Sequence, residues 1–198
     1  MSPDDAGSSR RRFFREASRR LISPVADYIE KRTGPPASPS SRRPMPILRP
    51  PGAIPEDRFV DVCRRCGACV AACPADAIVA LDKSMTKQSG TPAVNPDTAA
   101  CVICDGLQCT HVCPSGALLP LESPDEIKMG LAEVYAAMCV RSKDESCTLC
   151  VDRCPIGVAA ITFKDDGPPS VFPDGCTGCG ICQMYCPTTP KAIMIRPT

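Results

Sequence analysis

Short apolar segments recur at four places in the chain, each a few residues after a Cys-Pro dipeptide. Each segment begins with an alanine followed by isoleucine or leucine. The four pairs are Ala77-Ile78, Ala117-Leu118, Ala160-Ile161 and Ala192-Ile193. Because proline fixes φ, the dipeptide directs the chain out of the preceding loop, and each pair is predicted to start a return strand. A cysteine loop, a Cys-Pro dipeptide and an apolar strand thus form a unit that is present four times.

The N-terminal segment has a helical pattern instead. Apolar side chains recur at helical spacing across residues 10–31, and Ser23-Pro24 is typical of a helix start, so two short helices joined by a kink are predicted. Residues 10–20 hold six arginines and one glutamate. This predicts either a solvated basic helix resting on the body of the protein or a helix that docks on a partner or on an anionic membrane surface.

A second helix is predicted over residues 123–141. Ser123 is the expected cap, Pro124 the first helical residue, and Glu126 completes a capping box. Gly130 and the β-branched Val134 weaken the far half. A short helix followed by a strand that leads to the next cysteine is therefore the alternative.

These patterns divide the chain into three parts. Residues 1–32 form the basic amphipathic helical segment. Residues 33–58 contain eight prolines and are predicted to be an extended linker. Residues 59–198 form the body.

Composition leaves little for a conventional core. The 198 residues include 23 prolines, no tryptophan, five phenylalanines and three tyrosines. A formal net charge of +1 gives no reason to expect nucleic acid as a partner. No apolar run approaches the roughly 18 residues of a membrane span, so no transmembrane segment is expected.

The chain has sixteen cysteines, which can stabilise the fold in place of a large aromatic core. They fall into four quartets. The quartets are Cys63, Cys66, Cys69, Cys73; Cys101, Cys104, Cys109, Cys113; Cys139, Cys147, Cys150, Cys154; and Cys176, Cys179, Cys182, Cys186. The first and last match C-x2-C-x2-C-x3-C-P, in which three thiolates bind one 4Fe-4S cluster and the fourth binds a neighbouring cluster. The second has a longer middle gap and the third begins C-x7-C. All sixteen are therefore predicted metal ligands, and the cofactors are four 4Fe-4S clusters.

Other uses of the cysteines fit the spacing less well. Zinc ribbons use two separated C-x2-C pairs, and a disulfide scaffold needs an oxidising compartment. His111 lies between two cysteines, but each quartet is complete without it, so it is predicted to face solvent or to stand behind the ligands. Gly67, Gly178 and Gly180 are expected to provide positive φ in the tight loops.

Residues 9–15, Ser-Arg-Arg-Arg-Phe-Phe-Arg, are similar to a twin-arginine export motif. The uncharged apolar segment that should follow is interrupted by Glu16, Arg19 and Arg20. A cytoplasmic, membrane-peripheral protein is therefore expected, with contact through residues 10–31; export to the periplasm is the alternative.

The ordered set of four unequal spacings, preceded by Arg49-Pro50-Pro51-Gly52-Ala53, resembles the NapG/MauM family of polyferredoxins over residues 47–198. The resemblance implies a protein with four 4Fe-4S clusters that passes electrons between a quinol-linked membrane partner and a redox enzyme. It implies an α+β fold of tandem or nested bacterial-ferredoxin-like modules with little regular secondary structure.

Related four-cluster subunits pair their outer motifs with each other and their inner motifs likewise. Applied to this chain, the resemblance predicts an outer module of residues 59–90 plus 165–198 and an inner module of residues 91–164. One cluster would then bind Cys63, Cys66, Cys69 and Cys186, and its neighbour Cys176, Cys179, Cys182 and Cys73. The inner clusters would bind Cys101, Cys104, Cys109 and Cys154, and Cys139, Cys147, Cys150 and Cys113. Sequential pairing, first quartet with second and third with fourth, remains open.

No set of catalytic acids, bases or nucleophiles is apparent. The predicted function is single-electron relay without substrate chemistry of its own. The alternatives are an accessory or assembly factor with mainly structural clusters, and a permanent iron-sulfur subunit of a larger oxidoreductase.

Overall fold

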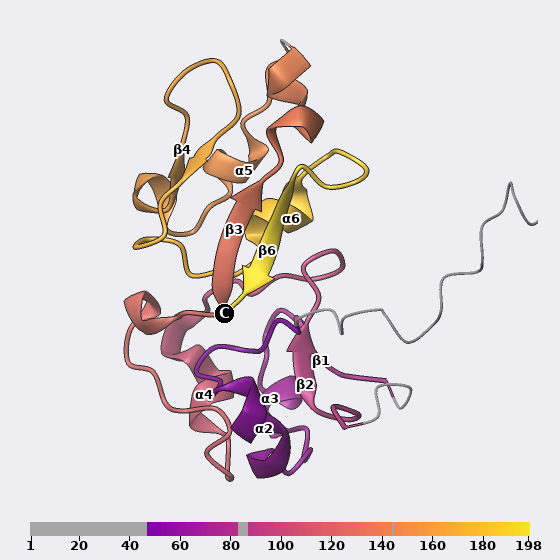
Figure 1. The fold of residues 1–198 in the computed structure, drawn as a ribbon. Helices are drawn as coiled ribbons and strands as arrows, with labels where there is room; N and C mark the ends of the chain where they lie inside the picture. Colours follow the sequence, from indigo (N-terminus) through magenta and orange to yellow (C-terminus); the bar gives the residue numbers. More distant parts are fainter. Residues whose placement is uncertain (1–46, 83–86, 144) are drawn as a thin grey trace, which may run out of the picture. The chain divides into compact units, whose positions relative to one another are not determined.

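Short helices alternate with short antiparallel strands in this computed structural model, which describes residues 47–82, 87–143 and 145–198 (Figure 1). The helices predicted within residues 10–31, the twin-arginine-like segment and most of the proposed linker lie outside these residues. The helices are α2 (Glu56–Val62), α3 (Ala68–Ala71), α4 (Gln108–His111), α5 (Leu149–Asp152) and α6 (Ile181–Tyr185). The 3₁₀ helices are Asp105–Leu107, Pro124–Glu126, Ala136–Met138, Val140–Lys143 and Gly157–Ala159.

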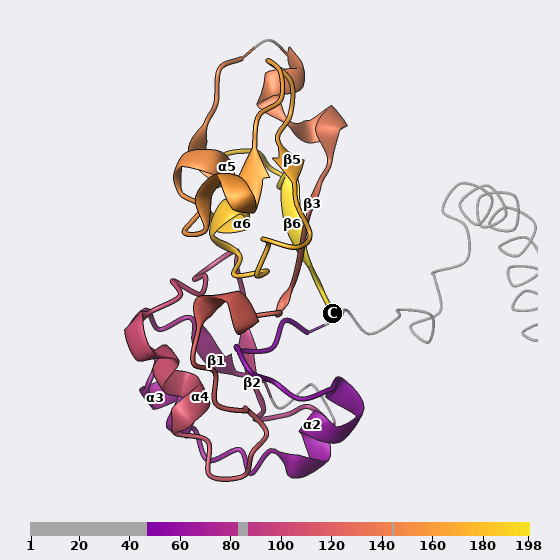
Figure 2. The same cartoon turned by 90° about the vertical axis from the view of Figure 1, so that its left-hand side faces the viewer.

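The strands form three separate antiparallel pairs rather than one sheet. The pairs are β1 (Ile78–Ala80) with β2 (Pro92–Val94), β3 (Gly130–Val134) with β6 (Ile193–Pro197), and β4 (Ile161–Thr162) with β5 (Ser170–Val171). Figures 1 and 2 show β3 and β6 side by side as the longest pair. The result is an irregular α+β ferredoxin-like fold. In the described part of the chain, no helix is long and apolar enough to span a bilayer.

All four Ala-Ile or Ala-Leu pairs are buried, with at most 3% of any of these residues exposed. Ile78, Ile161 and Ile193 each begin a strand, as the pattern predicts. Leu118 differs, because it makes only an isolated bridge to Ala53. The repeat unit is therefore confirmed as a burial pattern, and as a strand in three of its four copies.

The buried side chains form two larger groups that follow the sequence. One group joins buried residues between Leu48 and Met129, and the other joins buried residues between Ala132 and Ile193. Ile195 on β6 packs against both groups. Cysteines belong to both, so the thiols are part of the apolar interior rather than attached to its surface.

The start of the body lies earlier than residue 59. Leu48, Arg49, Pro50 and Pro51 are buried. Their segment is held by backbone hydrogen bonds from the Val94 N–H to the Leu48 carbonyl, 2.8 Å, and from the Leu119 N–H to the Gly52 carbonyl, 2.7 Å. The prediction that residues 47–58 belong to an extended linker is wrong, because Pro50 and Pro51 are buried in the body and α2 begins at Glu56.

Residues 123–141 do not form one helix. Ser123 and Glu126 make the expected capping box, but only a single 3₁₀ turn, Pro124–Glu126, follows it. The chain then extends into β3 and pairs with β6 along five residues. A β-carbon on Gly130 would lie 2.4 Å from the Arg196 carbonyl oxygen, so this glycine allows the two strands to approach. Pairing with β6 outweighs the local helical preference, and the alternative of a short helix and a strand is confirmed.

Arg49 is the main buried charge of the first group. Its guanidinium makes a bidentate pair with Glu56, 2.7 Å for each bond, and donates to the Thr91 hydroxyl at 2.8 Å and the Pro92 carbonyl at 2.7 Å. It also lies over the Phe59 ring, 4.5 Å from the centroid. These contacts join the proline-rich strap of residues 47–52, α2 and β2 around one cation.

We expect Glu56→Gln to lower the free energy of unfolding by about 1 to 2 kcal/mol, because it leaves a buried guanidinium without its counter-charge. Partial exposure of Glu56 keeps the effect below that of a fully buried pair. The measurement is the midpoint of anaerobic guanidinium unfolding followed by circular dichroism. Glu133→Gln is the matched control, since its ion pair with Arg196 is exposed and should matter little. Equal midpoints for the two variants would contradict this role of Arg49.

Candidate metal centres

Four cavities in the described residues are each lined by four cysteines. In each, three cysteines come from one quartet and the fourth is the last cysteine of the adjacent quartet. We name each set by one member. The Cys66 set is Cys63, Cys66, Cys69 and Cys113; the Cys104 set is Cys73, Cys101, Cys104 and Cys109; the Cys179 set is Cys154, Cys176, Cys179 and Cys182; the Cys147 set is Cys139, Cys147, Cys150 and Cys186.

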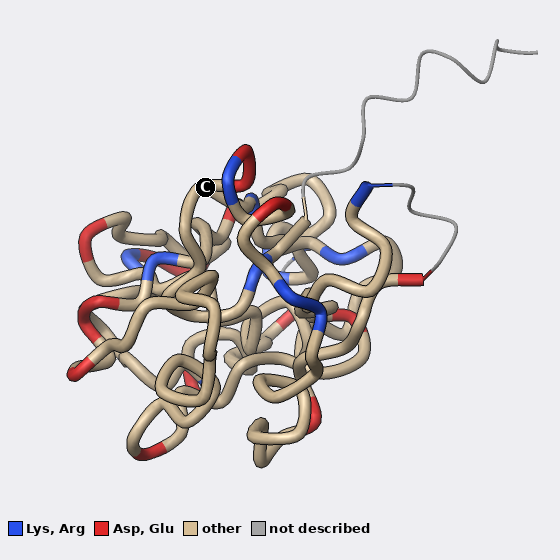
Figure 3. Tube along the Cα trace, turned by 90° about the horizontal axis from the view of Figure 1, so that it is seen from below, with Lys and Arg blue, Asp and Glu red and all other residues tan. Residues whose placement is uncertain are grey.

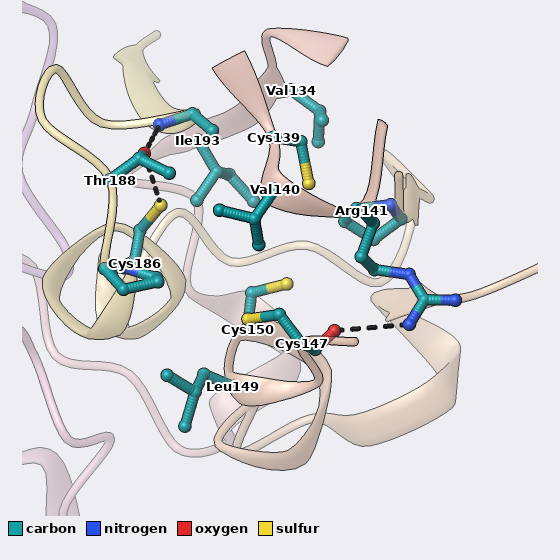
Figure 4. Close-up of a pocket in the computed structure, with 13 residues that line it drawn as sticks. Val134, Cys139, Val140, Arg141, Cys147, Leu149, Cys150, Cys186, Thr188 and Ile193 are labelled. Carbon is teal, nitrogen blue, oxygen red and sulfur yellow. Dashed lines mark hydrogen bonds between the residues drawn. The ribbon is translucent and has the colours of Figure 1, made fainter. Parts of the chain in front are cut away.

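The nested pairing of quartets is wrong, and the sequential alternative describes the structure. Cys186 lines a cavity with Cys139, Cys147 and Cys150, not with the first quartet (Figure 4). The cause is helix packing, because α3 packs against α4 and α5 against α6. The expected division into an outer and an inner module also differs from the structure. The pair of β1 with β2 and the pair of β3 with β6 each join a strand of the expected outer module to a strand of the expected inner module.

The short helices explain how neighbouring quartets exchange a thiol. Each of the helices α3, α4, α5 and α6 contains the third cysteine of a quartet, and the fourth follows one helical turn later. The helix pairs place these thiols in two adjacent cavities. The pairs of positions are Cys69 and Cys73, Cys109 and Cys113, Cys150 and Cys154, and Cys182 and Cys186.

Left-handed residues shape the loops between cysteines. Gly67, Gly178 and Gly180 have positive φ, as predicted from sequence. Arg65 and Ile103 share this conformation, with φ of 54° and 51°, although neither is glycine. Both directly precede the second cysteine of their quartet, the position that Gly178 holds in the last quartet. Alignment of the four quartets by their cysteines would therefore have pointed to a left-handed conformation at Arg65 and Ile103.

The donor set fits 4Fe-4S clusters. All sixteen cysteines are free thiols, and four thiolates are the ligands such a cluster requires. No group of His, Cys, Asp or Glu within the described ranges is arranged around a single metal ion. The thiols of each set instead line the wall of a shared cavity. His111 lines none of the four cavities; it is exposed, with Nε2 3.1 Å from the Leu121 carbonyl oxygen.

Burial makes most of the perturbed thiols weak acids in the free chain. It raises the pKa of Cys109 to about 12 and that of Cys69 to about 11, and neighbouring thiols add to both shifts. Burial and the nearby Cys179 also raise the pKa of Cys182. Thiols crowded in this way favour a bound cation, because deprotonated they repel one another and iron compensates their charge.

Two thiols behave in the opposite way. Burial alone would raise the pKa of Cys186, but hydrogen bonds from the Thr188 hydroxyl and from backbone N–H groups outweigh it and lower the pKa. The pKa of Cys113 is lowered for the same reason, by the Leu118 N–H, the Ser115 hydroxyl and nearby amides. Both are last cysteines of their quartets.

The four sets follow one another in a row. Cys69 of the Cys66 set lies close enough to Cys109 of the Cys104 set to repel it electrostatically. Cys150 of the Cys147 set acts in the same way on Cys182 of the Cys179 set. Between these two pairs, the Cys101 N–H donates to the Cys179 carbonyl at 3.0 Å. The Cys66 and Cys147 sets are therefore the ends of the row, and the Cys104 and Cys179 sets are inside it.

The contact between the two inner sets is closely packed. The Gln183 side-chain Nε2 donates to the Asp97 carboxylate at 2.8 Å, and the Gln183 side-chain Oε1 accepts from the Ile195 N–H at 2.8 Å. A β-carbon on Gly180 would lie 2.7 Å from Cβ of Pro96. The segment before Cys101 and the loop around Cys179 thus meet too closely for a β-carbon at Gly180.

Comparison with known proteins finds 4Fe-4S domains in two parts of the chain. A 4Fe-4S dicluster domain matches residues 62–117, and a 4Fe-4S binding domain matches residues 173–189. The methylamine utilization ferredoxin-type protein MauM of Methylophilus methylotrophus is 35% identical over 206 residues, which cover 100% of this chain and 90% of that protein. This chain belongs to the NapG/MauM family of ferredoxin-type proteins.

Two further members show the same likeness. The ferredoxin-type protein NapG of Escherichia coli is 38% identical over 162 residues, covering 76% of this chain and 70% of NapG. MauM of Paracoccus denitrificans is 36% identical over 170 residues, covering 81% and 75%. Together with the 4Fe-4S domains, membership of this NapG/MauM family supports an iron-sulfur electron-transfer role.

We expect Gly180→Ala to reduce iron content and stability far more than Gly67→Ala. Both glycines follow the second cysteine of a quartet and have positive φ. Gly67 has no atom within 4 Å of an added β-carbon, so alanine there brings only left-handed strain of about 1 to 2 kcal/mol. Gly180 would meet the rigid Pro96 ring. Iron per chain and the anaerobic unfolding midpoint measure the difference, and similar losses in both variants would contradict the packed contact.

Proposed function

We propose that the chain binds four 4Fe-4S clusters, one in each thiol set, and relays single electrons along the row between redox partners. The observation that supports this most strongly is that the four cavities use every cysteine once. Each cavity also exchanges one thiol with its neighbour, the ligand pattern of a two-cluster ferredoxin. The dicluster match over residues 62–117 spans the first two quartets and supports their pairing.

The clusters supply one-electron redox chemistry when bound. The chain's own residues hold each cluster through four thiolates, and buried Ala-Ile and Ala-Leu pairs exclude water behind the thiols. Backbone N–H groups in the left-handed loops are suited to donate to sulfur. No acid, base or nucleophile is needed for this function, so we propose an electron carrier without substrate chemistry.

The ends of the row are where partners would exchange electrons. Cys66 is exposed, whereas the other fifteen cysteines are buried or half-buried. A partner at the Cys66 set and a second at the Cys147 set would use the row end to end. By family resemblance, we propose a quinol-linked membrane donor and an oxidoreductase acceptor. In the described part of the chain, basic and acidic positions are interspersed (Figure 3).

The basic segment at residues 10–31 is our proposed docking element, either for a partner or for a membrane surface. We propose a membrane-peripheral location on the cytoplasmic side, with twin-arginine export as the alternative. Fractionation of cells, followed by the same experiment with the six arginines of residues 10–20 replaced, distinguishes these locations.

Anaerobically purified protein should contain about sixteen irons and sixteen acid-labile sulfides per chain, since each cluster holds four of each. Cys147→Ala should reduce the count, while the control His111→Ala should keep it. Electron paramagnetic resonance after stoichiometric reduction should show reversible uptake of about four electrons. About eight irons, or zinc, would contradict the cluster count. Clusters that accept electrons only on unfolding would instead favour an accessory or assembly factor.

A further inference from the structure

The residue after each Cys-Pro dipeptide differs between the end sets and the inner sets. Ser115 follows the dipeptide that contributes Cys113 to the Cys66 set, and Thr188 follows the one that contributes Cys186 to the Cys147 set. At the same position in the inner sets stand Ala75 and Ile156. All four positions are half-buried. Hydroxyl groups are thus placed beside the shared thiol at both ends of the row, and apolar side chains beside it inside the row.

Both hydroxyl groups reach the sulfur. The Thr188 Oγ1 lies 3.2 Å from the Cys186 Sγ, and the Ser115 Oγ lies 3.6 Å from the Cys113 Sγ. A thiolate bound to iron has no proton, so in the loaded protein the hydroxyl must be the donor.

The Thr188 contact has a defined direction. The Ala192 N–H donates to the Thr188 Oγ1 at 2.8 Å. Figure 4 shows the contact between Thr188 and Cys186. Because the amide occupies a lone pair of the oxygen, the hydroxyl hydrogen is free to point at the sulfur. Hydrogen bonds in such a chain polarise one another, which strengthens the contact to sulfur. The Ser115 contact is longer, so its effect should be smaller.

A hydrogen bond to a cluster thiolate stabilises the reduced state more than the oxidised state. Reduction adds one electron to a cluster that already carries negative charge, part of it on the thiolate sulfurs. A donor aimed at the sulfur therefore raises the reduction potential. No proton needs to be transferred, and the electron is the only species exchanged.

We propose that Ser115 and Thr188 are positioning residues that raise the potentials of the two end clusters above the values they would have with Ala or Ile at the same place. This proposal rests on the proposed four-cluster relay. A rise in these two potentials shifts the distribution of electrons toward the ends of the row, beside the partners, and away from the inner clusters. The inner pair would separate the two ends rather than store charge.

The test uses the full chain, purified anaerobically, in a redox titration monitored by electron paramagnetic resonance. Thr188→Val removes the hydroxyl while keeping the shape, and Thr188→Ser restores it. One cluster component should move to more negative potential in Thr188→Val, with a smaller shift in Ser115→Ala, and Thr188→Ser should match the parent chain. A tenfold change in the equilibrium between oxidised and reduced cluster corresponds to about 59 mV for a one-electron couple.

A reciprocal variant distinguishes an effect of the hydroxyl on the reduction potential from a purely structural role. Ala75→Ser adds a hydroxyl beside Cys73 in an inner set and should move one component to more positive potential. A purely structural role for the hydroxyls would not produce that gain. If Thr188→Val binds less iron than the parent chain, the potentials of Ala75→Ser and Ser115→Ala test the proposal instead. Unchanged potentials in these variants at full iron content would overturn the proposal alone, whereas a parent chain without four reducible clusters would overturn the proposed function.

Discussion

The exchange of one cysteine between neighbouring quartets is the constraint on which the rest of the structure depends. It requires that two short helices pack together so that thiols one turn apart enter two different cavities. The helix pairs α3 with α4 and α5 with α6 meet this requirement between sequence neighbours. Strand pairing and burial follow the same division, and the Cys101 to Cys179 hydrogen bond joins the two halves into a row.

This constraint also explains how so few aromatic residues suffice. Each half buries small apolar pairs and thiols instead of large rings, and Phe59 is the one aromatic residue among the largest fully buried side chains of the described body. Such interiors lack the apolar area for strong stability without their metal, so binding of clusters and folding should be coupled. Arg49 and its partners then complete the first half, where a proline-rich strap, α2 and β2 meet.

The local features of the site were accessible from sequence, whereas the pairing of its parts was not. The quartets, the buried Ala-Ile and Ala-Leu pairs, the capping box at Ser123 and the positive φ of Gly178 each follow from residues close together in the chain. Cysteine spacing is the same for nested and sequential pairing, so only the packing of helices distinguishes them. The strand β3 was similarly ambiguous, because its partner β6 lies about sixty residues away in sequence.

The most direct test of the sequential row is the crystal structure of anaerobically purified protein, with anomalous diffraction measured at the iron edge. The account predicts four groups of iron, with the Cys186 sulfur bonded to the group that also binds Cys139, Cys147 and Cys150. It equally predicts the Cys113 sulfur on the group bound by Cys63, Cys66 and Cys69. A Cys186 sulfur bonded to this last group would contradict the sequential pairing and with it the order of the row.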